Sequence, residues 1–163
     1  MASRLLSDLQ PAMKDKTLAF LEEAKSAGLD VLIYCTFRSL EEQAILYRQS
    51  RSLSEIKAKA KQLTTTFNRL DIMDILLGVG PQHGPHVTNA APGQSLHNYG
   101  YAFDGVPMVG GKPMWNSSHP SWQTYGQCAR SVGLEWAGDW TSFREYPHCQ
   151  LPGMDWRVLI QGR

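Results

Sequence analysis

The chain is organised around one stretch, Ser95-Leu96-His97-Asn98-Tyr99-Gly100-Tyr101-Ala102-Phe103-Asp104. This stretch places an imidazole and a carboxylate seven positions apart, with Gly100 and Ala102 between them. A second imidazole, that of His148, follows much later in Glu145-Tyr146-Pro147-His148. Two imidazoles and one carboxylate suit a catalytic zinc ion, because three protein ligands leave the fourth tetrahedral position open for water.

Strands are expected on the C-terminal side of this stretch. Residues 103–107 are expected to form a strand that carries Asp104, and Gly110-Gly111 supplies a turn after it. Residues 120–132 have the character of a helix that Gly133 closes. The remaining elements expected here are an aromatic loop over 135–140 and a last core strand over 148–151.

Helices are expected on the N-terminal side. Ser7-Asp8-Leu9-Gln10 resembles a capping box, which predicts a first helix with Pro11 in its first turn and Gly28 at its end. A buried strand over 31–36 precedes Ser39-Leu40-Glu41-Glu42, a second capping box whose helix runs to about Tyr47. Further predictions are a polar helix over 54–63, a short helix over 72–77 and a loop over 78–85. Helices therefore precede strands, which predicts an α+β fold with a small antiparallel sheet flanked by helices.

Size and composition are those of an ordinary globular domain. The 163 residues, 42% hydrophobic and 19% charged, predict one domain over 1–163 with a hydrophobic core. A formal net charge of +1 argues against binding to nucleic acid or to membrane surfaces. The absence of a signal-like or membrane-spanning apolar run predicts synthesis in the cytoplasm without a signal peptide and no stable membrane insertion. Cys35, Cys128 and Cys149 form no C-x-x-C pair and are expected to be buried, reduced thiols.

The chemistry of the candidate site follows from its charges. Glu145, three residues before His148, is the candidate general base, since it can take a proton from water and later pass it to a leaving amine. Arg38 lies at the junction of the strand and helix near residues 36–39, where sites are often built, and is the candidate cation for a carbonyl oxygen that gains negative charge. Pairing of Arg38 with Glu41 or Glu42 on the helix surface is the alternative.

The motifs resemble those of the LAS zinc peptidases, a group that includes D-Ala-D-Ala carboxypeptidases and many phage endolysins. Ser95-x-His97-x-x-Gly100-x-Ala102-x-Asp104 followed by Glu145-x-x-His148 resembles the signature of the group. Three other features resemble the phage L-alanyl-D-glutamate endopeptidases in particular. They are Phe37-Arg38-Ser39-x-x-Glu42-Gln43-x-x-Leu46-Tyr47, Val87-Thr88-Asn89-Ala90 and Gly133-Leu134-Glu135-Trp136-x-Gly138-Asp139-Trp140.

The resemblance, which covers roughly residues 30–151, implies a fold and a set of roles. It implies a LAS or hedgehog-like metallopeptidase fold, one zinc ion per chain held by His97, Asp104 and His148, Glu145 as base and Arg38 as carbonyl stabiliser. It also implies hydrolysis of the L-Ala–D-Glu bond in the peptide stem of peptidoglycan by a monomeric, holin-released endolysin. Residues 50–86 are expected to be a family-variable insertion, and no separate wall-binding domain is recognised. The candidate substrate-binding residues are Ser95, Gln43, Trp136, Asp139 and Trp140.

Several alternatives stay open at this point. A D,D- or L,D-carboxypeptidase of the same stem would use the same site, and a non-catalytic zinc-stabilised wall-binding module would not need Glu145. Ser95 either orients a ligand, binds substrate or caps its loop, and the aromatic residues near 136–140 either line a cleft or belong to the core. A Cys149–His148 nucleophile pair is disfavoured, because neighbours on a strand point to opposite faces. His83, His86 and His119 are expected to be structural or solvent-exposed, and a second metal pair at His83 and His86 is a disfavoured alternative, because both lie in or beside the predicted loop.

Overall fold

The computed structural model describes residues 1–162, which divide into two compact units. The sheet unit comprises Ala2–Phe37 and Gly100–Met154, and the helical unit comprises Arg38–Tyr99 and residues 155–162 together with Met1. Each unit has a hydrophobic core of its own. In this part of the chain, every helix is too short or too polar to cross a bilayer.

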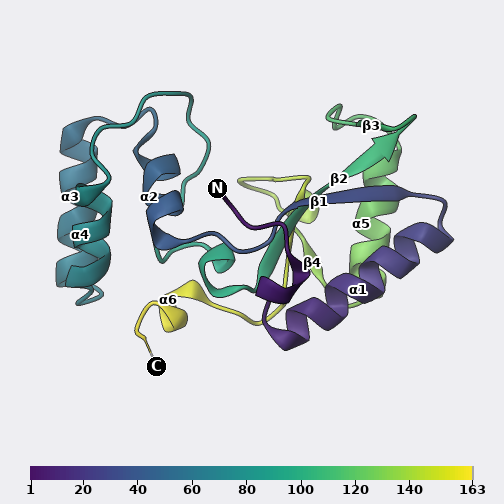
Figure 1. The fold of residues 1–163 in the computed structure, drawn as a ribbon, viewed down its shortest axis with the longest axis horizontal. Coiled ribbons are helices and arrows are strands. Elements are labelled where there is room, and N and C mark those ends of the chain that lie inside the picture. The colour runs from purple at the N-terminus through teal and green to yellow at the C-terminus, as the bar shows by residue number, and fades with distance from the viewer. Residues whose placement is uncertain (163) are drawn as a thin grey trace. The chain divides into compact units, whose positions relative to one another are not determined.

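The sheet unit is built on antiparallel strands in the order β1-β2-β5-β4, with β3 paired to β2 (Figure 1). The hairpin between β2 and β3 turns at Gly110 and Gly111, whose φ angles of 59° and 75° suit a two-residue turn between antiparallel strands. A type I′ turn needs positive φ at both central residues, which glycine adopts readily, so the glycine pair forms this turn as predicted. The strands are β1 (Asp30–Cys35), β2 (Ala102–Val109), β3 (Lys112–Pro113), β4 (Glu135–Trp136) and β5 (His148–Gln150).

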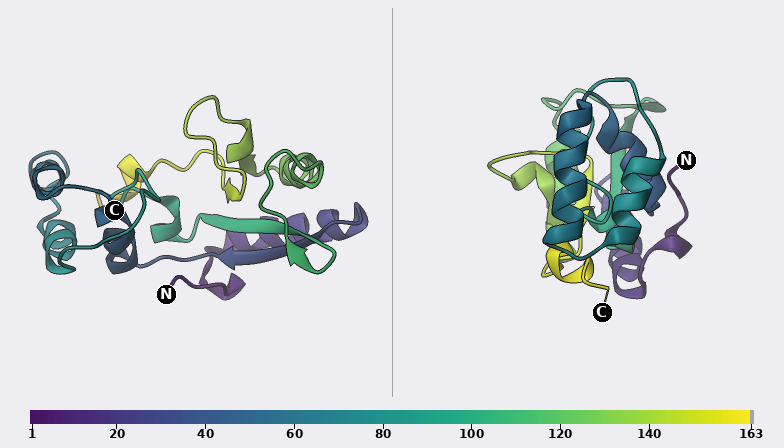
Figure 2. Two further views of the ribbon diagram at one scale, coloured as in Figure 1. Left: turned by 90° about the horizontal axis from the view of Figure 1, so that it is seen from above. Right: turned by 90° about the vertical axis from the view of Figure 1, so that its left-hand side faces the viewer.

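Helices α1 (Pro11–Ser26) and α5 (Ser121–Ser131) pack against this sheet and against each other (Figures 1 and 2). Phe20 of α1 contacts Phe103 of β2 and Tyr125 of α5, with ring centroids 5.3 and 5.0 Å apart. These rings are fully buried and form the centre of the core. A 3-10 turn over Leu6–Asp8 precedes α1, and a second one over Ala137–Asp139 follows β4.

Trp136 is enclosed in this core between two glycines. Its indole is 2% exposed and donates a hydrogen bond from Nε1 to the carbonyl oxygen of Tyr146, at 2.7 Å. A Cβ added at Gly126 of α5, or at Gly138, would overlap the indole ring. Close approach of backbone to ring therefore requires glycine at both positions.

We expect Gly126→Ala to lower the free energy of unfolding by about 1–3 kcal/mol, the usual cost of overpacking a core. Alanine is otherwise favoured over glycine in a helix by up to about 1 kcal/mol. Gly78→Ala is the matched control, because a Cβ at this helical glycine meets nothing within 4 Å and should leave stability equal or higher. Urea unfolding of both variants measures the difference. Equal midpoints for the two variants would contradict this account of the core.

The helical unit is held together by a second core. Helices α2 (Leu40–Arg48), α3 (Leu53–Thr65) and α4 (Leu70–Gly78) form it, with α3 and α4 side by side (Figure 2). A 3-10 turn over Leu96–Tyr99 and the short α6 (Trp156–Leu159) belong to the same unit. The residues buried in this core are Ala44, Tyr47, Ile56, Ala60, Leu63, Ile72, Leu76, Ala91 and Ile160.

Residues 50–86 supply five of these buried side chains, so the segment is a structural part of the helical unit and not only a surface loop. The predicted helices in this segment are confirmed, with slightly different bounds. Helix α3 begins at a capping box between Ser52 and Glu55, which was not among the predicted capping boxes. The prediction of one domain over 1–163 stays a prediction.

The fold class is confirmed as α+β with a small antiparallel sheet, and so is the capping box of Ser39 and Glu42. The capping box predicted at Ser7 is wrong. Ser7 lies in a 3-10 turn, and α1 begins only at Pro11 after Gln10, whose side chain makes no capping bond. Proline has no backbone N–H that a cap would have to bond, so the helix can start at Pro11 without a capping box. Two residues of the predicted aromatic loop instead form β4, because Glu135 and Trp136 pair with β5.

Candidate active site

Polar side chains gather on one face of the sheet unit, where β2, β5 and β4 meet. Asp104 of β2 lies opposite His148 of β5 in the register, and Gln150, two positions along β5, lies opposite Glu135 of β4. Residues two apart on a strand share a face, so this register places all four side chains on one side. The intervening residues on the opposite face are buried in the core. They are Phe103, Cys149 and Trp136.

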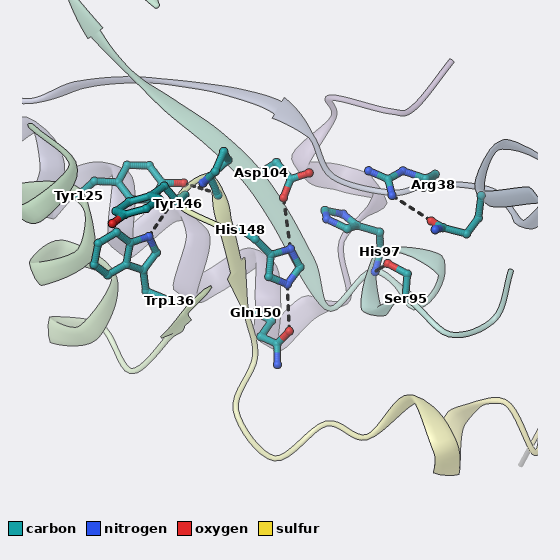
Figure 3. Close-up of polar contacts among 11 residues, drawn as sticks. Arg38, Ser95, His97, Asp104, Tyr125, Trp136, Tyr146, His148 and Gln150 are labelled. Carbon is teal, nitrogen blue, oxygen red and sulfur yellow. Dashed lines mark hydrogen bonds and ion pairs between the residues drawn. The ribbon is translucent and has the colours of Figure 1, made fainter. Parts of the chain in front are cut away.

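Asp104 and His148 meet directly on this polar face (Figure 3). His148 Nδ1 lies 3.2 Å from Asp104 Oδ1, and the two side chains are 9% and 15% exposed, respectively. Two donor atoms held by one tetrahedral zinc ion at about 2.0–2.2 Å are separated by about 3.3–3.6 Å. The observed separation is close to this range, so this pair fits two corners of a zinc site.

Glu145 lies just before β5, in the turn that leads into it. The backbone N–H of His148 donates to the Glu145 carbonyl oxygen at 3.3 Å, which closes a turn over Tyr146-Pro147. The Glu145 N–H in turn donates to the Ala137 carbonyl oxygen at 3.3 Å, and the side chain is exposed. Strand β5 begins at His148, directly after this proline-containing turn, close to the predicted strand over 148–151.

His97 belongs to the helical unit, in the 3-10 turn over Leu96–Tyr99, and is 3% exposed. Its backbone is fixed at two points: the N–H donates to Ser95 Oγ at 3.3 Å, and the carbonyl oxygen accepts from the Arg38 N–H at 3.1 Å. Asn98 Nδ2 also donates to the Arg38 carbonyl oxygen, at 2.9 Å. These bonds tie the backbone of Arg38 to that of His97 within one unit.

The guanidinium of Arg38 is oriented by a neighbour from α2. Arg38 Nη1 donates to Gln43 Oε1 at 2.9 Å (Figure 3). Gln43 is fully buried, and its amide nitrogen donates to the Ala90 carbonyl oxygen at 2.7 Å and to Thr88 Oγ1 at 3.3 Å. The amide oxygen of Gln43 must therefore face Arg38, because its nitrogen is engaged on the other side.

The other predicted substrate-binding residues lie in different surroundings. Ser95 caps the turn that carries His97, through the bond to its backbone. Trp136 is enclosed in the core, and Asp139 pairs with Arg130 at 2.9 Å on the surface. Trp140 is half-buried, and its ring centroid lies 5.7 Å from that of His148. Trp140 is thus a predicted contact whose ring lies beside the Asp104–His148 pair.

The cysteine predictions can be compared with the structure directly. Cys35, Cys128 and Cys149 are buried, reduced thiols, as predicted. Burial raises the pKa of the Cys149 thiol well above its ordinary value. Cys149 also points away from the face that carries His148, so these two residues do not form a nucleophile pair.

Two residues of the polar face, Glu135 and Gln150, were absent from the predicted set. Gln150 Oε1 lies 2.9 Å from His148 Nε2, and Gln150 Nε2 lies 3.3 Å from Glu135 Oε2. The two-residue spacing of His148 and Gln150 on a predicted strand was a signal for the first contact. The second contact depends on the pairing of β4 with β5, for which the sequence offered no signal.

Comparison with known proteins places this geometry in a family. A family model described as D-alanyl-D-alanine carboxypeptidase matches residues 88–151, which include His97, Asp104, Glu145 and His148. The chain is also 30% identical over 153 residues to peptidoglycan L-alanyl-D-glutamate endopeptidase CwlK of Bacillus subtilis (strain 168). The match spans 89% of this chain and 74% of CwlK. The chain belongs to the M15 peptidase family.

Solved structures agree with the M15 assignment at the level of fold. The Serratia marcescens L-Ala D-Glu endopeptidase ChiX matches with a TM-score of 0.52 and 16% identity, over 93% of this chain and 88% of ChiX. VanYB, solved in complex with D-Alanine-D-Alanine, matches with a TM-score of 0.51 and 14% identity, over 94% of this chain and 76% of VanYB. The predicted resemblance to the LAS-type peptidases is confirmed by the match to CwlK, and the predicted α+β fold agrees with these solved structures.

Proposed function

We propose that this M15 peptidase is a zinc-dependent peptidoglycan hydrolase that cuts the L-Ala–D-Glu bond of the stem peptide. The observation that carries the proposal is the Asp104–His148 pair, whose facing atoms lie 3.2 Å apart on the polar face of the sheet. The relationship to CwlK, an L-alanyl-D-glutamate endopeptidase by name, supports the choice of bond.

His97, Asp104 and His148 are the proposed zinc ligands, with one ion per chain. Two imidazoles and a carboxylate are ordinary zinc ligands, and a set of three is typical of catalytic sites. When bound, zinc supplies a Lewis acid and lowers the pKa of a water molecule. The backbone N–H and the backbone carbonyl oxygen of His97 are both hydrogen-bonded, which supports a fixed position for its imidazole.

Glu145 and Arg38 are the proposed catalytic residues. The exposed carboxylate of Glu145 takes a proton from the attacking water and then gives it to the D-Glu amine as the C–N bond breaks. The guanidinium of Arg38 stabilises the negative charge that develops on the L-Ala carbonyl oxygen. Gln43 acts through Arg38 as a positioning residue, which its full burial and its bond to the guanidinium support.

The positions of the predicted substrate-binding residues in the structure lead us to revise their proposed roles. Trp140, half-buried beside His148, is the candidate wall of the substrate site. The proposed role of Trp136 is to support that wall from the core, where its indole is enclosed. Ser95 is proposed to position His97 through its backbone. Direct contacts from Gln43 and Asp139 to substrate stay predictions.

The second candidate is a carboxypeptidase acting on the end of the same stem peptide. The description of the matching family model and the similarity in fold to VanYB favour it. A wall-binding module without turnover is the third possibility, although such a module does not require a base at Glu145.

Mass spectrometry of muropeptides after digestion of purified cell wall separates these candidates. We expect new peptides that begin with D-Glu, and we expect them to disappear when the protein is stripped with a chelator and to return with added zinc. Released free D-Ala would instead identify a carboxypeptidase, and intact muropeptides would identify a binding module. Products that are unaffected by chelation would overturn the zinc mechanism.

The biological setting is proposed from the same resemblance. We propose that the protein acts as a monomeric endolysin, is made in a host cytoplasm and reaches the wall through a phage holin. Co-expression with and without a holin tests this route, since lysis is expected only when both proteins are present.

A further inference from the structure

We propose that Glu135 and Gln150 form a relay that selects which ring nitrogen of His148 is available to the metal. The proposal rests on the proposed role of His148 as a zinc ligand. All of its members belong to the sheet unit, and the site residues that it adds lie outside the catalytic set described above.

The relay is a consequence of strand register. Glu135 and Gln150 are direct cross-strand partners on β4 and β5, so their side chains lie next to each other on one face. His148 precedes Gln150 by two residues on β5 and shares that face. The resulting contacts are 3.3 Å from Gln150 Nε2 to Glu135 Oε2 and 2.9 Å from His148 Nε2 to Gln150 Oε1.

Donor and acceptor chemistry gives the relay a direction. An ionised carboxylate only accepts hydrogen bonds, so Glu135 must receive the amide N–H of Gln150. The amide oxygen of Gln150 then faces His148 and also only accepts, which requires a hydrogen on His148 Nε2. Nδ1, the atom that faces Asp104, is thereby left as the nitrogen that can donate its lone pair to a metal.

Trp140 fixes the far end of the relay. Its indole N–H donates to Glu135 Oε1 at 2.8 Å, so the two oxygens of the carboxylate are engaged by different partners. Rotation of the carboxylate would break both contacts. The chain of contacts from Trp140 through Glu135 and Gln150 to His148 therefore holds the imidazole in one tautomer and one orientation.

Removal of the acceptor is the first test. Outer partners of metal-binding histidines are typically worth about 10- to 100-fold in metal affinity. We expect Gln150→Leu to lower zinc affinity by this factor, measured by competition with a chromophoric chelator. In the zinc-loaded wild-type protein, we expect the hydrogen on His148 Nε2 to exchange slowly with solvent and to give an NMR signal. In Gln150→Leu we expect this exchange to become fast and the signal to be lost. Circular dichroism checks that the variant is folded.

Exchanging the glutamate and the glutamine between positions 135 and 150 tests whether these residues act as a relay or have only a structural role. Gln150→Glu alone places two carboxylates against each other and should weaken zinc binding. Glu135→Gln combined with Gln150→Glu restores a donor at residue 135 and an acceptor at residue 150, so we expect zinc affinity and the protected Nε2 hydrogen to return. A double variant that binds zinc no better than Gln150→Glu alone overturns the relay, as does wild-type zinc affinity in Gln150→Leu.

These outcomes are distinct from those that test the proposed function, because zinc affinity and the NMR signal are read without substrate. A wild-type protein that binds zinc and responds to the variants as expected, but cuts no muropeptide, overturns the proposed function and supports the relay. A wild-type protein that digests wall while its zinc affinity is insensitive to Gln150→Leu supports the function and overturns the relay.

Discussion

Replacement of Glu145 by alanine is expected to lower the rate of wall digestion by about two to four orders of magnitude, the usual contribution of a positioned general base. The backbone of Glu145 is fixed by bonds to Ala137 and His148, so the turn should survive loss of the side chain. Glu145 is not a proposed zinc ligand, and the variant should therefore retain zinc. Muropeptide release and zinc content, measured on the same sample, check both statements.

Two further variants sharpen this result. Glu145→Gln keeps the shape of the side chain but cannot act as a base at neutral pH, so we expect it to be as inactive as the alanine variant. Glu22→Ala removes another exposed carboxylate, on α1, and should digest wall at the wild-type rate. Digestion at the wild-type rate by Glu145→Ala would show that the mechanism is wrong.

Arg38→Ala is expected to lower kcat by about two to three orders of magnitude, the range observed when one partner of a developing oxyanion is removed. Arg38→Lys retains a positive charge but loses the planar fork that bonds Gln43, so it should recover only part of the activity. Gln43→Leu should weaken turnover in the same direction with a smaller effect, since it acts through the guanidinium. Steady-state hydrolysis of a soluble stem peptide measures these differences.

Arg157 offers a matched control for the loss of an arginine. It pairs with Asp155 on the surface, with both side chains about half exposed or more, and such pairs contribute little. Arg157→Ala should therefore leave kcat unchanged. An Arg38→Ala variant with wild-type kcat and raised KM would assign Arg38 to substrate binding alone.

Local signals predicted much of the fold. The glycine pair at 110–111, the capping box at Ser39 and the apolar run of β1 each determine structure within a few residues, and all three are confirmed. The capping box predicted at Ser7 was wrong because the pattern makes capping bonds possible but does not require them. The helix instead begins at Pro11. Local patterns thus predict which elements exist more reliably than where they begin.

The candidate site was predictable only in part. The motif spacing identified Asp104 and His148, and the structure pairs them. Gln150 and Glu135 were missed because their roles depend on the register between β4 and β5, which long-range packing determines. The helical unit shows the same limit, since the spacing of Ile56, Ala60 and Leu63 predicts a helix but not the core that it joins.

The burial of all three cysteines affects how readily the protein is oxidised. A thiol reacts with oxidants mainly as the thiolate, and burial both shields the sulfur and disfavours that form. Cys149 combines complete burial with a raised pKa, and Cys35 and Cys128 are buried as well. We therefore expect these three thiols to stay reduced when the protein is purified and assayed without a reducing agent.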